Sequence, residues 1–363
     1  MIYLDYQATT PLAPEALDAM LPWLRDQHAN PHSAHSPGRA AKAAVEVARE
    51  RLLALLPTGG SLAFTSGATE ALNWAIKGTT GPIVTIATEH AAVLDTVEAV
   101  QRQGREVTIL PVDAAGLVDL DAAALAIVPG VGLVAAMLVN NETGVVQPIA
   151  KLASLARSAG ARMLCDAVQG YGRVPIPAGC DLVAISGHKI HGPKGIGALW
   201  VRNGVALEPL MHGGGQEALG RSGTLSPTLC AGFGAAAAVM ISNSHVDKAH
   251  VDRLFSAACA RFGEGWHING STNQRYHGNL NLRRDGLDVA RLMSDCRDIA
   301  FSAGSACASG SGRASHVLRA MDLTEAQARA SIRLGFGRYT TQDELMTAID
   351  RINAAAAVQE QYA

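Results

Sequence analysis

Aromatic side chains are scarce in this sequence, because Phe, Tyr and Trp together make up only 4% of its 363 residues. The core must therefore be aliphatic, and hydrophobic residues of all kinds reach 48%. A chain of this length has ample material for a packed core and usually divides into about two domains. Abundant alanine and glycine favour closely packed helices and strands joined by tight turns.

An excess of either charge is also absent, since the formal net charge is −2. This balance argues against nucleic acid or an anionic membrane as the main partner. Apolar stretches such as Ala231–Ile241 are too short to span a bilayer. The first residues have neither the basic nor the apolar region of a secretory signal. We therefore expect a cytoplasmic protein with no nucleic-acid or membrane partner.

Cysteine pairs are missing too. None of the six cysteines stands in a C-x-x-C pair, which excludes a zinc knuckle or a thioredoxin-like site. The histidine pairs His188/His191 and His32/His35 have no further ligands at suitable spacing, so no metal site is predicted. Cys307 stands in a stretch of Gly, Ser and Ala that is typical of a mobile loop. The other cysteines have apolar or helical surroundings and are expected to be buried and inert: Cys165, Cys180, Cys230, Cys259 and Cys296.

Up to about residue 240, short apolar runs alternate with helical patterns. The expected strands are Ser61–Thr65, Ile83–Ala87, Val107–Pro111, Leu133–Val139, Arg162–Cys165, Leu182–Ser186 and Ala198–Val201. The expected helices are Ala68–Lys77, Ala92–Gln103, Leu120–Ile127 and Ile149–Ala159. This alternation predicts an α/β fold with a mainly parallel central sheet flanked by helices. Ligands of such sheets bind at the carboxyl ends of the strands.

The pattern changes near residue 240, where a second, smaller α+β domain is predicted. Its expected elements are a helix at Asp247–Phe262, then Asn279–Arg283, Val289–Cys296, Ile299–Ser302, His316–Met321, Ser331–Gly335 and Asp343–Ala356. We therefore divide the chain into a large domain at 1–240 and a small domain at 241–363. Whether the extreme N-terminus packs on the small domain is open at this point.

Lys189 stands in the most informative segment, where an apolar strand runs into Ser186-Gly187-His188-Lys189 and a glycine-rich loop. A surface turn with a solvated lysine would also fit. A phosphate-binding Walker A loop does not fit, because Pro193 stands where that motif has lysine. The surviving interpretation is a lysine poised to form a Schiff base.

A cofactor with a pyridine ring on Lys189 needs an anion at the ring nitrogen and a flat group over the ring. Asp166 ends an apolar strand and can supply the anion, with Gln169 in reach of a ring oxygen. A strand-end aspartate is also a common turn former or helix cap. His90 follows another strand and is placed to stack, although a lone histidine is more often structural.

A phosphate cradle and an anion-binding arginine complete the candidate set. Thr65–Glu70 joins a strand to a helix through Gly67, and a helix N-terminus binds phosphate. An ordinary helix cap is the alternative. Arg333 stands in an apolar strand, where a buried guanidinium requires an anion such as a substrate carboxylate. An internal salt bridge is its alternative.

These segments together resemble the cysteine desulfurases, which are class-V aminotransferase-like enzymes of the pyridoxal-phosphate (PLP) fold-type I group. The matching motifs run in family order through nearly the whole chain: YLDYQATT (Tyr3–Thr10), ANPHSAHSPGR (Ala29–Arg39), FTSGATEALN (Phe64–Asn73), TEHAAVLDT (Thr88–Thr96), VNNETGVVQPI (Val139–Ile149), CDAVQGYGRVPI (Cys165–Ile176), SGHKIHGPKGIGAL (Ser186–Leu199), HGGGQEALGRSGT (His212–Thr224), SAGSACASGS (Ser302–Ser311) and SIRLGFGRYTT (Ser331–Thr341).

The resemblance implies a role for each matching position. Lys189 would bind PLP covalently, Cys307 would be the nucleophile, and Arg333 would bind the substrate carboxylate. His90 would stack on the ring and relay protons. The further cofactor contacts would come from Asp166 at the pyridine nitrogen, Gln169 at the ring oxygen, Asn141 beside cofactor and substrate, Ala68, Thr69, Ser186 and His188 at the phosphate, and Thr224 at the phosphate of the neighbouring subunit in a homodimer.

The implied reaction converts L-cysteine to L-alanine and leaves a persulfide on Cys307, which passes its sulfur to an acceptor protein. The long Gly/Ser-rich segment around Cys307 is similar to that of the group serving iron–sulfur cluster assembly. Housekeeping members of this group have a longer C-terminal tail that helps to dock the cluster scaffold. This sequence ends at Ala363, so we do not expect that docking mode.

Two other functions compete with this interpretation. The first is a selenocysteine lyase or another class-V PLP lyase or aminotransferase, of which the selenocysteine lyase is harder to exclude. The second is a non-catalytic sulfur-relay protein that kept the fold, against which the presence of Lys189 and Asp166 argues.

Overall fold

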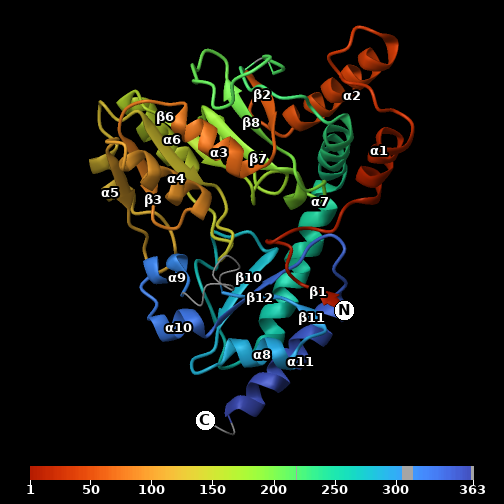
Figure 1. Ribbon diagram of the computed structural model, residues 1–363. Helices are drawn as coiled ribbons and strands as arrows, with labels where there is room; N and C mark the ends of the chain where they lie inside the picture. Colours follow the sequence, from red (N-terminus) through yellow and green to blue (C-terminus); the bar gives the residue numbers. More distant parts are fainter. Residues whose placement is uncertain (218, 305–313, 361–363) are drawn as a thin grey trace.

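A seven-stranded sheet organises the larger part of the molecule (Figure 1). The computed structural model describes residues 1–217, 219–304 and 314–360. The strand order is β2-β8-β7-β6-β5-β3-β4, and β8 alone runs antiparallel to its neighbours. The strands are β2 (Gly60–Thr65), β3 (Ile83–Ile86), β4 (Val107–Leu110), β5 (Leu133–Met137), β6 (Arg162–Asp166), β7 (Leu182–Ser186) and β8 (Gly197–Arg202). The predicted mainly parallel sheet is thus confirmed.

Helices cover both faces of this sheet because its central strands are apolar on both sides. Every residue of β5 and β7 is buried. Within β5, Leu133 and Ala135 join one hydrophobic cluster, and Val134 and Ala136 join the other, as expected from the alternation of side chains along a strand. The covering helices are α3 (Ala68–Lys77), α4 (Ala91–Gln101), α5 (Leu120–Ala126) and α6 (Ile149–Ala159).

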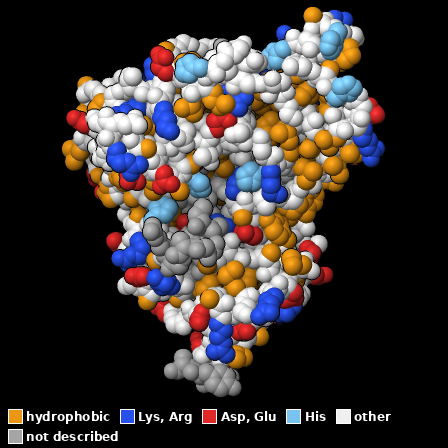
Figure 2. Space-filling view, viewed as in Figure 1, with side chains coloured by type: hydrophobic (Ala, Val, Ile, Leu, Met, Phe, Trp, Pro, Cys, Tyr) orange, Lys and Arg blue, Asp and Glu red, His pale blue; other side chains and the backbone are white. Residues whose placement is uncertain are grey.

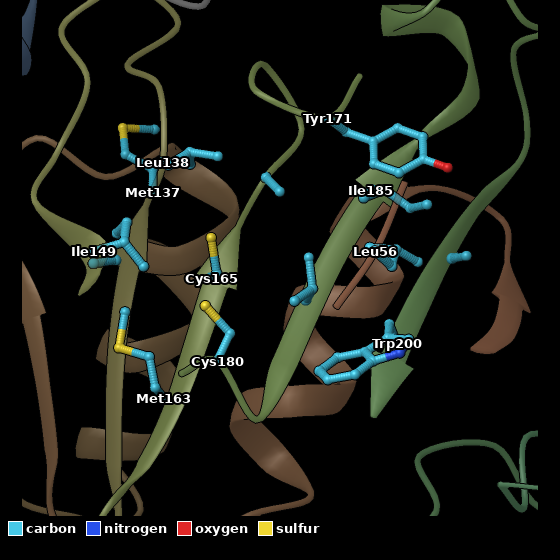
Figure 3. Packing of buried hydrophobic residues seen from close by; sticks show 14 of the residues in the cluster. Leu56, Met137, Leu138, Ile149, Met163, Cys165, Tyr171, Cys180, Ile185 and Trp200 are labelled. Atoms are coloured by element: carbon cyan, nitrogen blue, oxygen red, sulfur yellow. The ribbon is translucent and has the colours of Figure 1, made fainter. Parts of the chain in front are cut away.

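Two cysteines face each other within one of these clusters (Figure 3). Cys165 on β6 and Cys180 have no exposed surface. A hydrogen bond with Cys180, together with burial, raises the pKa of the Cys165 thiol well above its ordinary value. Cys230 and Cys296 are also buried, and Cys259 is half-buried. The predicted burial is therefore confirmed for Cys165, Cys180, Cys230 and Cys296 and is only partial for Cys259.

A single long helix, α7 (Pro227–Phe262), runs from the seven-stranded sheet into the second part of the molecule (Figure 1). The sequence had predicted only its second half. Its first half packs against α1 (Pro14–Arg25) and α2 (Ser36–Leu53). By length and composition α7 resembles a membrane span, but half of its most apolar window is buried inside the protein. Packing on α1 and α2 accounts for this apolar character.

The second part contains a four-stranded antiparallel sheet in the order β12-β13-β10-β9. Its elements are β9 (His267–Ile268), β10 (Asn279–Arg283), β12 (Ser302–Ala303), β13 (Ser331–Gly335), α8 (Val289–Asp295), α9 (His316–Ala320), α10 (Glu325–Arg329) and α11 (Gln342–Glu360). Most of these bounds lie within a few residues of the predicted ones.

The extreme N-terminus belongs to this second part. Strand β1 (Ile2–Tyr3) pairs in parallel with β11 (Ile299–Ala300), and Leu4 is buried in the hydrophobic cluster beside the four-stranded sheet. The chain then crosses back toward the seven-stranded sheet. The division of the chain at residue 240 stays a prediction.

Candidate active site

A cavity of about 560 Å³ lies where the carboxyl ends of β2, β6 and β7 meet the N-terminal segment. This is the edge at which α/β sheets bind ligands. Ten of the predicted site residues line it: Ala68, Thr69, His90, Asn141, Asp166, Gln169, Ser186, His188, Lys189 and Arg333. Thr224 does not line this cavity and is exposed. Cys307 lies outside the described residues.

Lys189 ends a short 3₁₀ turn, Gly187–Lys189, that directly follows β7. Its Nζ donates to the carbonyl oxygens of Gln7 and Ala8, and the second distance is 2.9 Å. The Thr10 hydroxyl donates to the carbonyl of His188 at 2.9 Å and accepts from the backbone N–H of His191 at 2.7 Å. The N-terminal segment therefore holds both the amine and the backbone around it.

Histidines near this lysine are neutral at physiological pH. Burial, and secondly the charges of Lys189 and Lys194, lower the pKa of His188 to about 4. His191 also has a pKa of about 4, again chiefly because of burial. It adopts a left-handed backbone conformation with φ 67°, which is unusual for a residue other than glycine. The Thr10 contact holds this conformation.

Asp166 ends β6 and is 5% exposed. Its Oδ1 accepts a hydrogen bond from the backbone N–H of Val168 at 2.9 Å. Burial raises the pKa of this carboxyl, while the Val168 hydrogen bond and the charges of His90 and Lys189 oppose the rise. Among the described residues it has no salt-bridge partner. A buried carboxylate of this kind is stabilised by a cation, and a protonated pyridine nitrogen is one.

Glu89 is a buried carboxyl group next to the cavity-lining His90, and the sequence did not reveal it. It has no exposed surface, and its Oε1 accepts from the backbone N–H of Met137 at 2.6 Å. Its Oε2 has no hydrogen-bond partner in the described part of the chain. Burial, and secondly the charge of Asp166, raise the pKa of Glu89 well above its ordinary value. An acidic residue three positions after the buried strand β3 (Ile83–Ile86) was the available signal.

His90 caps the N-terminus of α4 with its side chain. Its Nδ1 lies 3.0 Å from the backbone nitrogen of Ala92 and accepts a hydrogen bond from it. A neutral ring that accepts at Nδ1 carries its proton on Nε2. Burial lowers the pKa of His90, although the charge of Asp166 opposes this. The site therefore has a flat, neutral ring with one N–H donor.

The predicted phosphate cradle lies at the N-terminus of α3. Gly67 precedes the helix and offers no side-chain cap, so the first N–H groups of α3 can donate to an anion. A Cβ built on Gly67 would meet nothing within 4 Å, which shows open space beside this turn. Glu70 reaches back to accept from the backbone N–H of Ser66 at 2.7 Å and also pairs with Arg221 at 2.8 Å.

For Arg333 on β13 the structure shows the internal salt bridge, and the role in binding a substrate carboxylate stays a prediction. It forms an internal salt bridge with Asp5, with Nη2 2.8 Å from Oδ1, and it also lines the cavity. Its Nη1 donates to the carbonyl of Asn141 at 3.0 Å, and its Nε has no partner among the described residues. The side-chain Oδ1 of Asn141 is also unpartnered there. Arg333 is 1% exposed.

Gln169 was predicted to contact a ring oxygen of the cofactor. Its amide nitrogen donates to the carbonyl of Gln7 at 2.9 Å, and the residue still lines the cavity. The Gln7 side chain donates in turn to the carbonyl of Gly278 at 2.8 Å. Gln169 thus links the end of β6 to the N-terminal segment that holds Lys189.

The side chains of this cavity fit PLP. Lys189 supplies the amine, Asp166 a buried carboxyl group, and His90 a flat neutral ring. The uncapped N-terminus of α3 supplies N–H donors for a phosphate, in line with the open space beside Gly67. Arg333 and the unpartnered Oδ1 of Asn141 provide polar groups for a substrate at the same cavity.

Comparisons with known proteins agree with this geometry. The profile of the family Aminotransferase class-V matches residues 2–347. The curated protein "Cysteine desulfurase IscS" of Rickettsia felis is 44% identical, with 97% of this chain and 90% of the relative covered. The same-named protein of Rickettsia bellii is 43% identical at the same coverage.

Solved structures give the same result. A "NIFS-LIKE PROTEIN" matches with a TM-score of 0.91 and 29% identity, and covers 98% of this chain and 99% of its own. The structure "SspA in complex with cysteine" matches with a TM-score of 0.84 and 34% identity, with 94% of this chain and 100% of that one covered.

Proposed function

This chain belongs to the class-V aminotransferase family and, within it, to the cysteine desulfurases; from this premise we propose that it binds PLP on Lys189 and transfers the sulfur of L-cysteine to Cys307. The observation that carries the proposal is the cavity that gathers Lys189, Asp166, His90 and Arg333. A lysine with a buried anion, a flat ring and a phosphate cradle is the equipment that PLP chemistry needs.

Each residue then has one task. Bound PLP supplies an electron sink for the carbon that loses its proton. Lys189 takes up and returns that proton, and Asp166 keeps a cation paired at the buried end of the cavity. Arg333 orients the substrate carboxylate through its fork. His90 covers the ring and can donate through Nε2.

The sulfur step belongs to Cys307. Its thiolate forms an S–S bond with the substrate sulfur while the C–S bond breaks, and the carbon takes up a proton to leave alanine. The persulfide on Cys307 then passes its outer sulfur to a thiol of an acceptor protein. We propose an iron–sulfur cluster scaffold as that acceptor, in the cytoplasm.

We also propose that the working form is a homodimer. Thr224 is exposed and does not line the cavity of its own chain, which suits a role at the partner's phosphate. Figure 2 shows hydrophobic side chains gathered along the right edge of the molecule, over α1 and α7. Exposed apolar side chains there include Leu17 and Leu24 of α1 and Ile241 and Val246 of α7. An apolar area of this kind favours subunit association.

The decisive experiment compares two pairs of variants. Lys189→Ala is expected to lose the visible absorbance of the bound cofactor, whereas Lys77→Ala, an exposed lysine, keeps it. Cys307→Ala is expected to lose at least 99% of alanine formation from cysteine, on the order of other nucleophile removals. Cys259→Ala, which changes a half-buried thiol of α7, keeps it.

Three outcomes would contradict the proposal. A colourless wild-type protein that cannot bind PLP would support the sulfur-relay alternative. Unchanged turnover of cysteine in Cys307→Ala would show that Cys307 is not the nucleophile. Selenocysteine turned over in preference to cysteine, and without need of Cys307, would identify a selenocysteine lyase.

A further inference from the structure

A second cavity, of about 520 Å³, lies between the two parts of the molecule. Segment 172–175 and His191 contribute from the side of the seven-stranded sheet. Residues 244–252 of α7, the segment 273–277 and residues 337–338 contribute from the other side. Volumes of this size are typical of small-molecule sites. Neither Lys189 nor Asp166 lines it, so it is separate from the candidate active site.

Positive charge prevails in the lining of this second cavity. Its four permanent cations are Arg173, Lys248, Arg275 and Arg338, and its two carboxylates are Asp247 and Asp252.

Both carboxylates already have partners. Asp247 pairs with Arg338, with Nε 3.0 Å from Oδ1. Asp252 pairs with Lys248 at 2.6 Å and with His277 at 2.7 Å. In the part of the chain that the structure describes, Arg173 and Arg275 have no carboxylate within salt-bridge distance.

Arg275 is the more unusual of these two cations because it is only 7% exposed. Its guanidinium donates to the carbonyl oxygens of Thr143 at 2.7 Å, Asn279 at 3.0 Å and Ser271 at 3.2 Å. It lies 5.2 Å from the ring centre of Phe255. Burial lowers the pKa of Arg275 to about 10, so it stays charged at neutral pH. A buried charge without a counter-ion is costly.

Arg173 lies on the opposite wall. Its guanidinium donates to the carbonyls of Gln169 at 3.3 Å and Lys189, and it lies 5.3 Å from the ring centre of Tyr276. Arg173 therefore contacts both the second cavity and the backbone of the active-site lysine.

We propose that this second cavity binds a small organic anion through Arg173, Lys248 and Arg275. Guanidinium groups bind carboxylate and phosphate oxygens in bidentate geometry, and two uncompensated guanidiniums line one cavity. Met240, Val174 and Pro175 in the same lining provide apolar surface for the body of such a ligand. The site goes beyond the proposed desulfurase activity and does not depend on it.

Isothermal titration of the cofactor-loaded protein tests this proposal. Orthophosphate and citrate are titrated separately at constant ionic strength, with sodium chloride as the control. Loading fills the phosphate cradle at α3, so saturable binding at one probe per chain excludes that cradle, and the variants below distinguish the second cavity from Arg333 of the active site. Binding of orthophosphate alone identifies a phosphate ligand, and stronger binding of citrate identifies a carboxylate.

Variants locate the binding. Arg173→Gln and Lys248→Gln are each expected to weaken binding about tenfold or more, because each removes a charge-assisted contact. Arg102→Gln is the control, because it removes an exposed charge of an ion pair after α4. It is expected to change the affinity for either probe less than twofold. Lys248 is 74% exposed at its side chain, so its replacement does not threaten folding. No saturable binding of either probe, or binding that both cavity variants leave unchanged, would overturn the proposal.

Discussion

Glu89 and Asp166 are neighbouring carboxyl groups, both almost fully buried. Two ionised carboxylates in such a place repel each other and have lost their water. The structure keeps Glu89 protonated by burying it completely, with Asp166 as the second cause of its raised pKa. Asp166 can then carry the single negative charge that a pyridine nitrogen requires.

This arrangement makes stability depend on pH. The folded protein holds the proton of Glu89 over a pH range in which the unfolded chain has lost it. The free energy of unfolding therefore falls by about 1.4 kcal/mol per pH unit as the pH rises above the ordinary pKa of a glutamate. The fall ends where the pH reaches the raised pKa of Glu89 in the folded protein.

Glu89→Gln is expected to remove this fall, because glutamine keeps an oxygen for the Met137 N–H and has no proton to lose. Its urea midpoint, relative to wild type, should rise over the pH range that begins above the ordinary pKa of a glutamate carboxyl. Glu98→Gln, a change at an exposed carboxylate, should run parallel to wild type. A constant difference between Glu89→Gln and wild type across this range would contradict an uncharged Glu89.

At the residue scale, the sequence predicted the side chains that follow strand ends, such as Lys189, Asp166 and His90. It did not predict that the carbonyls of Gln7 and Ala8 hold the lysine amine. Backbone oxygens have no signature in a sequence, and these contacts join positions more than 180 residues apart. Glu89 was missed because its role depends on burial rather than on its residue type.

Helix α7 is the element that the sequence described least well. Ser226 accepts from the N–H of Leu229, and Pro227 occupies the first turn, which is a start signal typical of helices. The glycines at 232 and 234 obscured it, since glycine lowers helix propensity. The structure gives their reason: the backbone of α7 approaches α1 and α2 closely at these positions.

Gly234→Ala is expected to destabilise the protein by about 1 to 3 kcal/mol, because a Cβ there would lie 2.6 Å from Cα of Ala48. The backbone of α2 cannot move away from the new Cβ as easily as a flexible side chain can. Gly232→Ala is the matched control, because its Cβ would meet the flexible side chain of Met20. Urea unfolding should show a much smaller loss for Gly232→Ala, and equal losses would contradict the close approach at Ala48.

At the scale of the whole molecule, the candidate active site depends on distant parts of the chain. Asp5 from the N-terminal segment pairs with Arg333 of β13, and Arg333 lines the cavity that β6 and β7 frame. The strands and the mainly parallel character of the larger sheet follow from apolar runs that a sequence displays. The contact between the N-terminal segment, β13 and the ends of β6 and β7 does not follow from such runs, because no periodicity in the sequence relates these three regions.

Subunit mixing tests whether the partner completes each site. Lys189→Ala and Thr224→Arg homodimers are each expected to be inactive, the second because a bulky cation replaces an exposed threonine at the interface. Mixed dimers keep one site with both native residues. Unfolding and refolding the two variants together should therefore restore about a quarter of wild-type activity.

A mixture of Lys189→Ala with Asp166→Asn, prepared in the same way, provides the control. Both changes lie in one chain's own cavity, and each mixed dimer then has one defect in each site, so no activity should return. Failure of the first mixture to regain activity, with dimers present by light scattering, would contradict a shared site.

The parallel pairing of Ile2 with Ile299 has a consequence for synthesis on the ribosome. The residues that hold Lys189 follow β1 directly, but the strand partner of β1 is translated almost 300 positions later. At ordinary translation rates this interval is roughly 15 to 60 s. The pairing that fixes the start of the N-terminal segment therefore forms only after most of the chain has been translated.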